Sequence, residues 1–115
     1  MAQQAIPVYL RLRETIAAAI IDGVYDEGER LPSVRAFAAE QGANPLTVAK
    51  AYQQFQADGL VEVQRGVGMY VVPGAAGRLK AMERERFLAE EWPAIAQRIG
   101  RLDIELAELL REPVG

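Results

Sequence analysis

The apolar residues near the start of the chain recur with the period of an α-helix. The residues that share this pattern are Tyr9, Leu12, Ile16, Ala19 and Ile20. Side chains three or four positions apart lie on one face of a helix, so this spacing predicts a helix with one buried side. We expect it to begin at Pro7, which suits a first helical position, and to end at Gly23.

A segment rich in turn-forming residues separates this helix from the next apolar pattern. It runs from Asp22 to Pro32 and contains two glycines as well as the proline. Such a composition is typical of a loop. We expect Val24, Tyr25 and Leu31 within the loop to pack back onto the core.

Two short helices are predicted next, with only about three residues between them. Ser33 is a favourable N-cap for the first helix, and Gly42 is a favourable residue to end it. Asn44 is placed to cap the second helix, Pro45 fits its first position, and Gly59 closes it. The short connection is typical of a helix-turn-helix.

A β-hairpin is predicted immediately after the second of these helices. Two β-prone runs, Leu60–Gln64 and Met69–Val72, flank the sequence RGVG. A helix, a helix-turn-helix and a hairpin follow one another in this order in a winged helix. The sequence therefore predicts a mainly α fold with a small β-hairpin, and a winged helix-turn-helix domain at residues 1–73.

The remainder of the chain is predicted to be a linker at residues 74–77 and a helical tail at residues 78–112. Apolar residues of the tail follow heptad spacing: Leu88, Trp92, Ile95, Ile99, Leu102, Leu106 and Leu109. Pro93 should kink or restart the helix, and Asp103 is placed to cap a last short helix. This apolar seam either clamps onto the winged helix of the same chain or joins two copies of the chain in a dimer.

The second helix of the predicted pair, residues 45–58, has two chemically different faces. Its inner arc holds apolar and aromatic residues: Val48, Ala51, Tyr52 and Phe55. Its outer arc holds a mixture: Leu46, Thr47, Lys50, Gln53 and Gln54. An apolar tip, a hydroxyl, an ammonium group and amides are the groups that read base edges and hold phosphates in a major groove. The alternative is a solvated face with one stray leucine.

The composition argues against an enzyme and against a metal site. The chain contains no Cys and no His, so it lacks thiolate ligands, the commonest general base and the commonest transition-metal ligand. The RGVG sequence is too short for a phosphate-binding loop and lies in a predicted hairpin. We expect no cofactor, no metal ion and no catalytic residue.

The sequence gives no indication of a membrane or export segment. The N-terminus lacks the charged start and the apolar stretch of a signal peptide, and no apolar run approaches the length of a spanning helix. We expect a soluble, cytoplasmic protein with no membrane partner.

The charge balance counts against nucleic-acid binding. The net charge is −3, and acidic residues outnumber basic ones on both sides of Ala76. A nucleic-acid module usually carries a basic surface. A DNA-binding function therefore depends on where the few positive side chains lie.

Several motifs resemble those of the GntR family of bacterial transcription regulators. They are PVYLRLRETI, YDEGERLPSVRAFA, NPLTVAKAY, DGLV and RGVGMYV, and the resemblance extends roughly from Ile6 to Val72. The NPLTVAKAY form and the short tail resemble the small YtrA subfamily. The resemblance implies a winged helix that binds double-stranded operator DNA as a homodimer, usually as a repressor. The larger GntR subfamilies attach a ligand-binding domain for which this chain has no room. Either an effector, which the sequence does not identify, binds at the dimer interface, or there is none.

The resemblance also implies individual DNA contacts. Ser33 and Arg35 match the family's PSxR element, whose arginine meets DNA at the start of its helix. Asn44, Thr47 and Lys50 match positions of the recognition helix. With the outer-arc leucine and the wing tip at residues 65–68, the candidate DNA-binding residues are Ser33, Arg35, Asn44, Leu46, Thr47, Lys50, Arg65 and Gly66.

Two departures from the family limit what can be carried over. Many members have arginine where this chain has Pro45 and Ala49, so their guanine contacts are not implied here. The second departure is the ending of the wing, GMYV in place of the commoner GTFV, which is a conservative change.

The wing tip itself agrees with the family. Gly66, after Arg65, matches the family's glycine that approaches the minor groove.

Each candidate contact has a structural alternative. Arg35 can instead pair with Glu29 or Glu40, and Lys50 can be a solvated side chain. Gly66 can serve only the tight turn of the hairpin. Arg11, Arg13 and Arg30 are further positive charges available to add to a DNA surface.

Three classes of function remain in competition. The first is a dimeric operator-binding repressor, and the second is a winged helix used only for protein–protein contact, which the acidic charge would suit. Arg35 and the Arg65-Gly66 pair favour the first class, because a protein-binding module needs neither. The third class is an enzyme, which the missing His and Cys disfavour.

Overall fold

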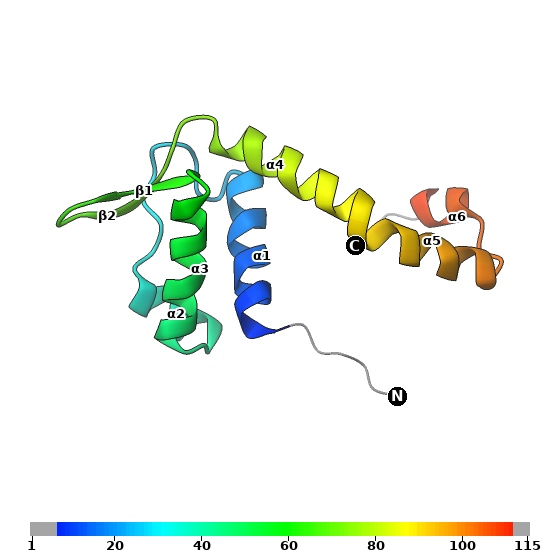
Figure 1. Cartoon of the computed structure of the whole chain (residues 1–115), viewed down its shortest axis with the longest axis horizontal. Helices are drawn as coiled ribbons and strands as arrows, with labels where there is room; N and C mark the ends of the chain where they lie inside the picture. Colours follow the sequence, from blue (N-terminus) through cyan, green and yellow to red (C-terminus); the bar gives the residue numbers. More distant parts are fainter. Residues whose placement is uncertain (1–6, 112–115) are drawn as a thin grey trace. The chain divides into compact units, whose positions relative to one another are not determined.

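The computed structural model describes residues 7–111. Its elements, in chain order, are α1 (Val8–Ile21), α2 (Val34–Gln41), α3 (Pro45–Ala57), β1 (Val61–Gln64), β2 (Gly68–Val71), α4 (Ala75–Arg86), the π-helical segment η1 (Phe87–Glu91), α5 (Trp92–Arg101) and α6 (Leu106–Arg111) (Figure 1). The predicted fold class, mainly α with one small hairpin, is confirmed. Residues 1–6 and 112 of the predicted domains lie outside the described part of the chain.

The chain divides into two compact units, an N-terminal unit at Met1–Lys80 and a C-terminal unit at Ala81–Gly115. The N-terminal unit contains the winged helix, and its boundary falls within α4. Between residues 7 and 111, no helix has both the length and the apolar character that crossing a bilayer requires.

The caps of α2 and α3 are those that the sequence predicts. The Ser33 hydroxyl accepts a hydrogen bond from the Ala36 N–H at 3.0 Å, and Gly42 ends α2 with a φ of 63°. The Asn44 side-chain oxygen accepts from the Leu46 N–H at 2.7 Å. These bonds satisfy amide groups that the first turn of a helix leaves unpaired. The short turn between α2 and α3 is thereby fixed.

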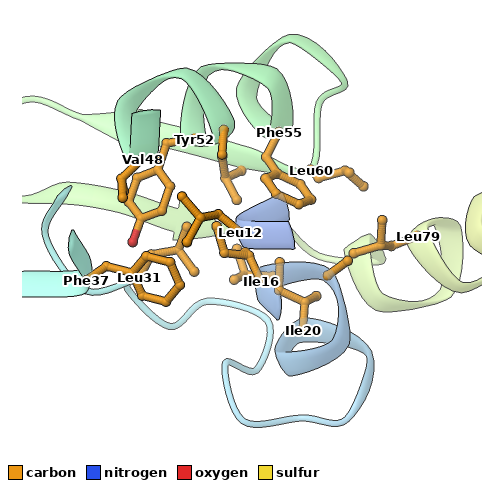
Figure 2. Close-up of a cluster of buried hydrophobic side chains, with 14 of the residues drawn as sticks. Leu12, Ile16, Ile20, Leu31, Phe37, Val48, Tyr52, Phe55, Leu60 and Leu79 are labelled. Carbon is orange, nitrogen blue, oxygen red and sulfur yellow. The ribbon is translucent and has the colours of Figure 1, made fainter. Parts of the chain in front are cut away.

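One hydrophobic core joins the helices and the hairpin of the N-terminal unit, as Figure 2 shows. Its largest fully buried side chains are Ile16, Ile20, Val48, Phe55, Leu60, Val71 and Leu79. Of the loop residues expected to pack here, Leu31 is buried and Tyr25 is partly buried. The expectation for Val24 is wrong, because this side chain is 64% exposed. Its amide instead closes the end of α1 by donating to the Ala19 carbonyl at 2.8 Å.

The hairpin has one edge covered by the loop that precedes α2. Strands β1 and β2 are antiparallel, with Val61 opposite Val71. On the other side of β2, the Leu31 N–H donates to the Met69 carbonyl at 2.8 Å. This pairing satisfies backbone groups that an edge strand would otherwise expose. It also attaches the base of the wing to the segment that leads into α2.

The first turn of α4 belongs to the core of the N-terminal unit. Ala75 and Leu79 are both fully buried there. The expected linker at residues 74–77 is therefore corrected, because Pro73 and Gly74 form a turn and the helix begins at Ala75. The Gly- and Ala-rich sequence suggested a loop and obscured the four-residue spacing of Ala75 and Leu79.

The C-terminal unit is helical and is interrupted next to Pro93, as predicted. The Trp92 N–H donates to the carbonyl of Phe87, five residues back, which makes Phe87–Glu91 a π-helical segment. Proline has no N–H with which to continue the regular helical pattern. The interruption therefore takes the form of a widened turn before α5.

The predicted heptad seam does not lie on one continuous helix. Helix α5 ends at Arg101, and Leu102 is already its C-cap. Leu106 and Leu109 lie on the separate short helix α6. The seven residues with heptad spacing are therefore distributed over the π-helical segment η1, helix α5, the turn after it and helix α6.

The expectation that Asp103 caps the last helix is wrong. Asp103 has a φ of 55°, in the left-handed region, and helix α6 begins only at Leu106. The Asp103 N–H donates to the Gly100 carbonyl at 3.2 Å, and the Ile104 N–H donates to the Ile99 carbonyl at 3.0 Å. These two bonds form a Schellman motif, so Asp103 ends α5 in the position that glycine usually takes.

Candidate nucleic-acid interface

The two chemically different faces predicted for residues 45–58 are present on α3. Its inner side chains are buried in the core: Val48, Ala51, Tyr52 and Phe55. On the outer side, Leu46 in the first turn of the helix is 80% exposed. Lys50 and Gln53 are exposed as well, and Thr47 is half-buried. The helix therefore presents an apolar tip and polar groups together.

Lys50 is exposed, but it is not simply solvated. Its ammonium nitrogen lies 4.6 Å from the centre of the Tyr9 ring on α1, a cation–π geometry. The Tyr9 hydroxyl donates to the side-chain oxygen of Gln54 at 3.3 Å. The helical pattern predicts that Tyr9 lies beside the apolar stripe of α1. It does not predict the contact between Tyr9 and Lys50, because these two residues lie far apart in the chain. Tyr9 thus joins the candidate residues.

Arg35 lies in the first turn of α2 and is exposed. The predicted alternative, an ion pair with Glu29 or Glu40, does not occur. Within the part of the chain that the structure describes, Arg35 has no ion pair and no side-chain hydrogen bond. Glu29 instead accepts from the Asp26 N–H at 2.7 Å. The Arg35 guanidinium is therefore available to a partner outside the chain.

The wing tip has the tight turn that the sequence predicts. The turn comprises residues 65–67, and Gly66 has a φ of 77°, which favours glycine. Arg65 and Val67 are exposed. Gly66 is thus needed for the turn itself, whatever it contacts, and Arg65 provides a positive charge at the tip.

Two arginines considered as further DNA contacts are used within the fold. Arg13 is only 8% exposed, its guanidinium lies 5.4 Å from the centre of the Phe55 ring, and it pairs with Asp58 at 3.9 Å. Arg30 donates to the Val67 carbonyl at 3.2 Å and so secures the wing turn. Arg13 is therefore excluded as a surface contact, while Arg11 remains exposed.

A groove of about 610 Å³ lies between the start of α2 and the wing. Ser33 and Arg30 line it together with Val67 and Gly68. At its base, the Tyr52 hydroxyl donates to the Pro32 carbonyl at 2.7 Å. Burial raises the pKa of Tyr52, and the nearby Tyr25 and Glu40 add to the shift. Of the predicted DNA-binding residues, the groove brings Ser33 close to the wing, whereas Arg35 does not line it.

The acidic residues do not assemble into an obvious ion site. Among residues 7–111, no group of three or more acidic side chains is arranged to hold a metal ion.

The sequence matches a known family over most of the winged helix. The profile described as "Bacterial regulatory proteins, gntR family" matches residues 8–71, more than half of the chain. The HTH-type transcriptional repressor YtrA of Bacillus subtilis (strain 168) is 34% identical over 73 residues, which are 64% of this chain and 56% of that protein. The chain thus matches less than two thirds of the length of this relative.

Solved structures extend the similarity. A transcriptional regulator from Oenococcus oeni is 30% identical and matches 96% of this chain and 91% of its own with a TM-score of 0.70. The DNA-binding domain of AraR, solved in complex with operator ORR3, matches 63% of this chain and 87% of its own with a TM-score of 0.59. At 22% identity, that likeness shows the fold alone. The chain belongs to the gntR family of bacterial regulatory proteins, and within that family it resembles YtrA.

Proposed function

We propose that this chain is a homodimeric transcriptional repressor that binds an inverted-repeat operator. Helix α3 enters the major groove, and the wing tip meets the minor groove. The observation that carries the proposal is the exposed arginine at the start of α2, Arg35, beside a recognition helix whose apolar tip, Leu46, is also exposed. Because Arg35 has no ion pair and no side-chain hydrogen bond within residues 7–111, its guanidinium is available to a phosphate or a base edge.

The acidic net charge is compatible with this proposal because each of the three candidate elements carries a positive side chain. Arg35, Lys50 and Arg65 lie at α2, α3 and the wing turn, respectively. The first amides of a helix also attract phosphate without a formal charge. Placed contacts determine specific binding, whereas a low positive charge weakens nonspecific binding. We therefore expect specific binding with weak background affinity.

The C-terminal unit supports the dimer. Its apolar residues include several that are exposed in the single chain: Leu88, Ile95, Leu102, Leu106 and Leu109. Trp92 and Ile99 are partly buried, and the Trp92 ring packs beside Phe87 with the centres 6.5 Å apart. Apolar surface of this kind is typical of a protein interface. A two-fold dimer places two recognition helices on DNA, which requires an inverted repeat.

Repression is favoured because the relative YtrA is named a repressor. A bound dimer that covers promoter DNA needs no further activity to block transcription. An effector, if the protein has one, would bind at the interface between the two C-terminal units.

DNA selection followed by titration tests the proposal. A duplex enriched from a random-sequence library by the wild-type protein should contain an inverted repeat. Arg35→Ala should abolish binding to it while leaving the fold intact, because Arg35 contacts nothing in the core. Arg84→Ala, which removes one exposed positive charge from α4, is the matched control. Failure to enrich any sequence would refute the proposal, and unchanged affinity would remove Arg35 from the interface.

A further inference from the structure

The outer face of α3 is not independent of the rest of the fold. Figure 1 shows α1 and α3 side by side, and residues of the two helices are in contact. At this junction Tyr9 of α1 contacts Lys50 through its ring and Gln54 through its hydroxyl. One aromatic side chain thus holds two polar side chains of the recognition helix.

The geometry follows from helical periodicity. Lys50 and Gln54 are four residues apart, so they lie one above the other on the same edge of α3. Tyr9 lies in the first turn of α1 and is half-buried, so its ring is itself held by the fold. A half-buried ring restricts a flexible lysine more than a second flexible side chain would.

We propose that Tyr9 is a positioning residue for DNA recognition. It acts through Lys50 and Gln54, which it orders before DNA arrives. The inference rests on the proposed DNA-binding function and adds to it a residue on α1 that none of the expected contacts includes. Tyr9 is assigned no contact with DNA in this role.

The advantage is one of conformational entropy. Lysine and glutamine lose much rotamer freedom when they are immobilised. A side chain that is already restricted in the free protein loses less on binding, so preorganisation increases affinity without a new contact. Preorganisation of Lys50 matters because the candidate interface has few positive side chains. Each phosphate contact therefore contributes a larger share of the binding energy.

Two double-mutant cycles test the proposal on the duplex enriched by the wild-type protein. The first combines Tyr9→Leu with Lys50→Ala. Loss of the ring should weaken binding about two- to fivefold, the range expected for an exposed cation–π contact. In the Lys50→Ala background, Tyr9→Leu should have no further effect.

The second cycle combines Tyr9→Phe with Gln54→Ala. Tyr9→Phe keeps the ring over Lys50 and removes only the hydroxyl that bonds to Gln54. It should weaken binding in the wild-type background and be silent in the Gln54→Ala background. Because phenylalanine preserves packing, this cycle remains informative even if Tyr9→Leu fails to fold. Thermal denaturation of every variant checks the fold.

The outcomes separate the inference from the function on which it rests. If the wild-type protein enriches no duplex, the proposed function fails. If it binds, but Tyr9→Leu and Tyr9→Phe weaken binding equally in both backgrounds, Tyr9 acts independently and the positioning role is wrong. Tighter binding by Tyr9→Leu would also overturn it, because Tyr9 would then be holding Lys50 away from DNA.

Discussion

The guanidinium of Arg78 donates a hydrogen bond to the main-chain carbonyl of Asp58 at 2.8 Å. A second bond, at 3.1 Å, goes to the carbonyl of Gly59. Both carbonyls lie at the C-terminal end of α3, where a helix carries partial negative charge and unpaired acceptors. The Asp58 side chain pairs in addition with Arg13 from α1. The C-terminal end of α3 is therefore held by arginines from two other helices.

Arg78→Ala should lower the free energy of unfolding by about 1 kcal/mol, the typical net contribution of an intramolecular hydrogen bond. Arg78→Lys should restore part of this loss, since an ammonium group can reach one carbonyl but not bond to both in the same planar geometry. Urea denaturation measures the difference. Lys80→Ala, on the same helix, is the control. Equal stability of Arg78→Ala and Lys80→Ala would show that the two bonds contribute nothing measurable.

Lys50 and Thr47 should differ in what their substitutions change. If Lys50 holds a phosphate, Lys50→Ala weakens binding to all sequences alike and lowers the salt slope of the affinity by about one. Lys80→Ala is the matched lysine control. Titrations over a range of salt concentrations measure the slope, and identical slopes for wild type and Lys50→Ala would contradict the phosphate contact.

Thr47→Val removes a hydroxyl and keeps the shape of the side chain. If Thr47 touches a base edge, the preferred base at one operator position should change by about 1–3 kcal/mol. The same result is expected for Leu46→Ala if the leucine contacts a thymine methyl group. A repeated selection from random DNA detects the change, and recovery of the wild-type sequence by both variants would place these two residues outside the base contacts.

Ile95→Asp with Ile99→Asp should give a folded monomer that no longer binds the operator. Two carboxylates on the apolar face of α5 would be buried at high cost in a dimer. A monomer makes half the contacts and loses the high effective concentration of the second site. Sedimentation beside a DNA titration measures both properties. The control is Gln97→Asp with Arg101→Asp, which adds the same number of carboxylates away from that face and should remain a dimer that binds the operator.

Truncation of the tail is informative only if it spares the core. A fragment that ends at Pro73 lacks Ala75 and Leu79, which are fully buried, and should be unfolded. A fragment that ends at Lys80 keeps them and should be a folded monomer. A dimeric fragment of this length, or a monomer with wild-type affinity for the operator, would show that the tail has another purpose.

Stability should decline in alkali because of Tyr52. The pKa of Tyr52 is raised in the folded chain above the ordinary value of 10.0, mainly by burial. Below pH 10 the group is protonated in both states, so its contribution is fully present. Above that pH the unfolded chain releases the proton first, and stability falls as the pH rises. Urea denaturation across this range should show a flatter decline for Tyr52→Phe than for Tyr70→Phe, and parallel declines would contradict the assignment.

The local features of the fold could be predicted from sequence because their causes are local. Ser33 and Asn44 cap helices through bonds to residues two or three positions away. The buried face of α3 likewise follows from a short period. The exposure of Leu46 could be predicted from the same rotation of the helix, although its role in binding remains a prediction.

The contacts that could not be predicted join distant parts of the chain. Tyr9 and Gln54 are 45 residues apart, and Arg78 and Asp58 are 20 residues apart. The burial of Arg13 could have been predicted from helical spacing. Arg13 lies four residues before the buried Ala17 and hence on the inner side of α1. Its charge suggested the surface, but the ring of Phe55 and the carboxylate of Asp58 make its burial favourable.

The burial of Ala75 and Leu79 has a consequence for how such proteins acquire new C-terminal domains. A gene fusion that joined a foreign domain directly after Pro73 would discard part of the winged-helix core. A successful recombination point must therefore lie beyond Leu79, inside α4 and not in the turn before it. Chimeras built from this chain should be joined within that helix, with its first turn kept intact.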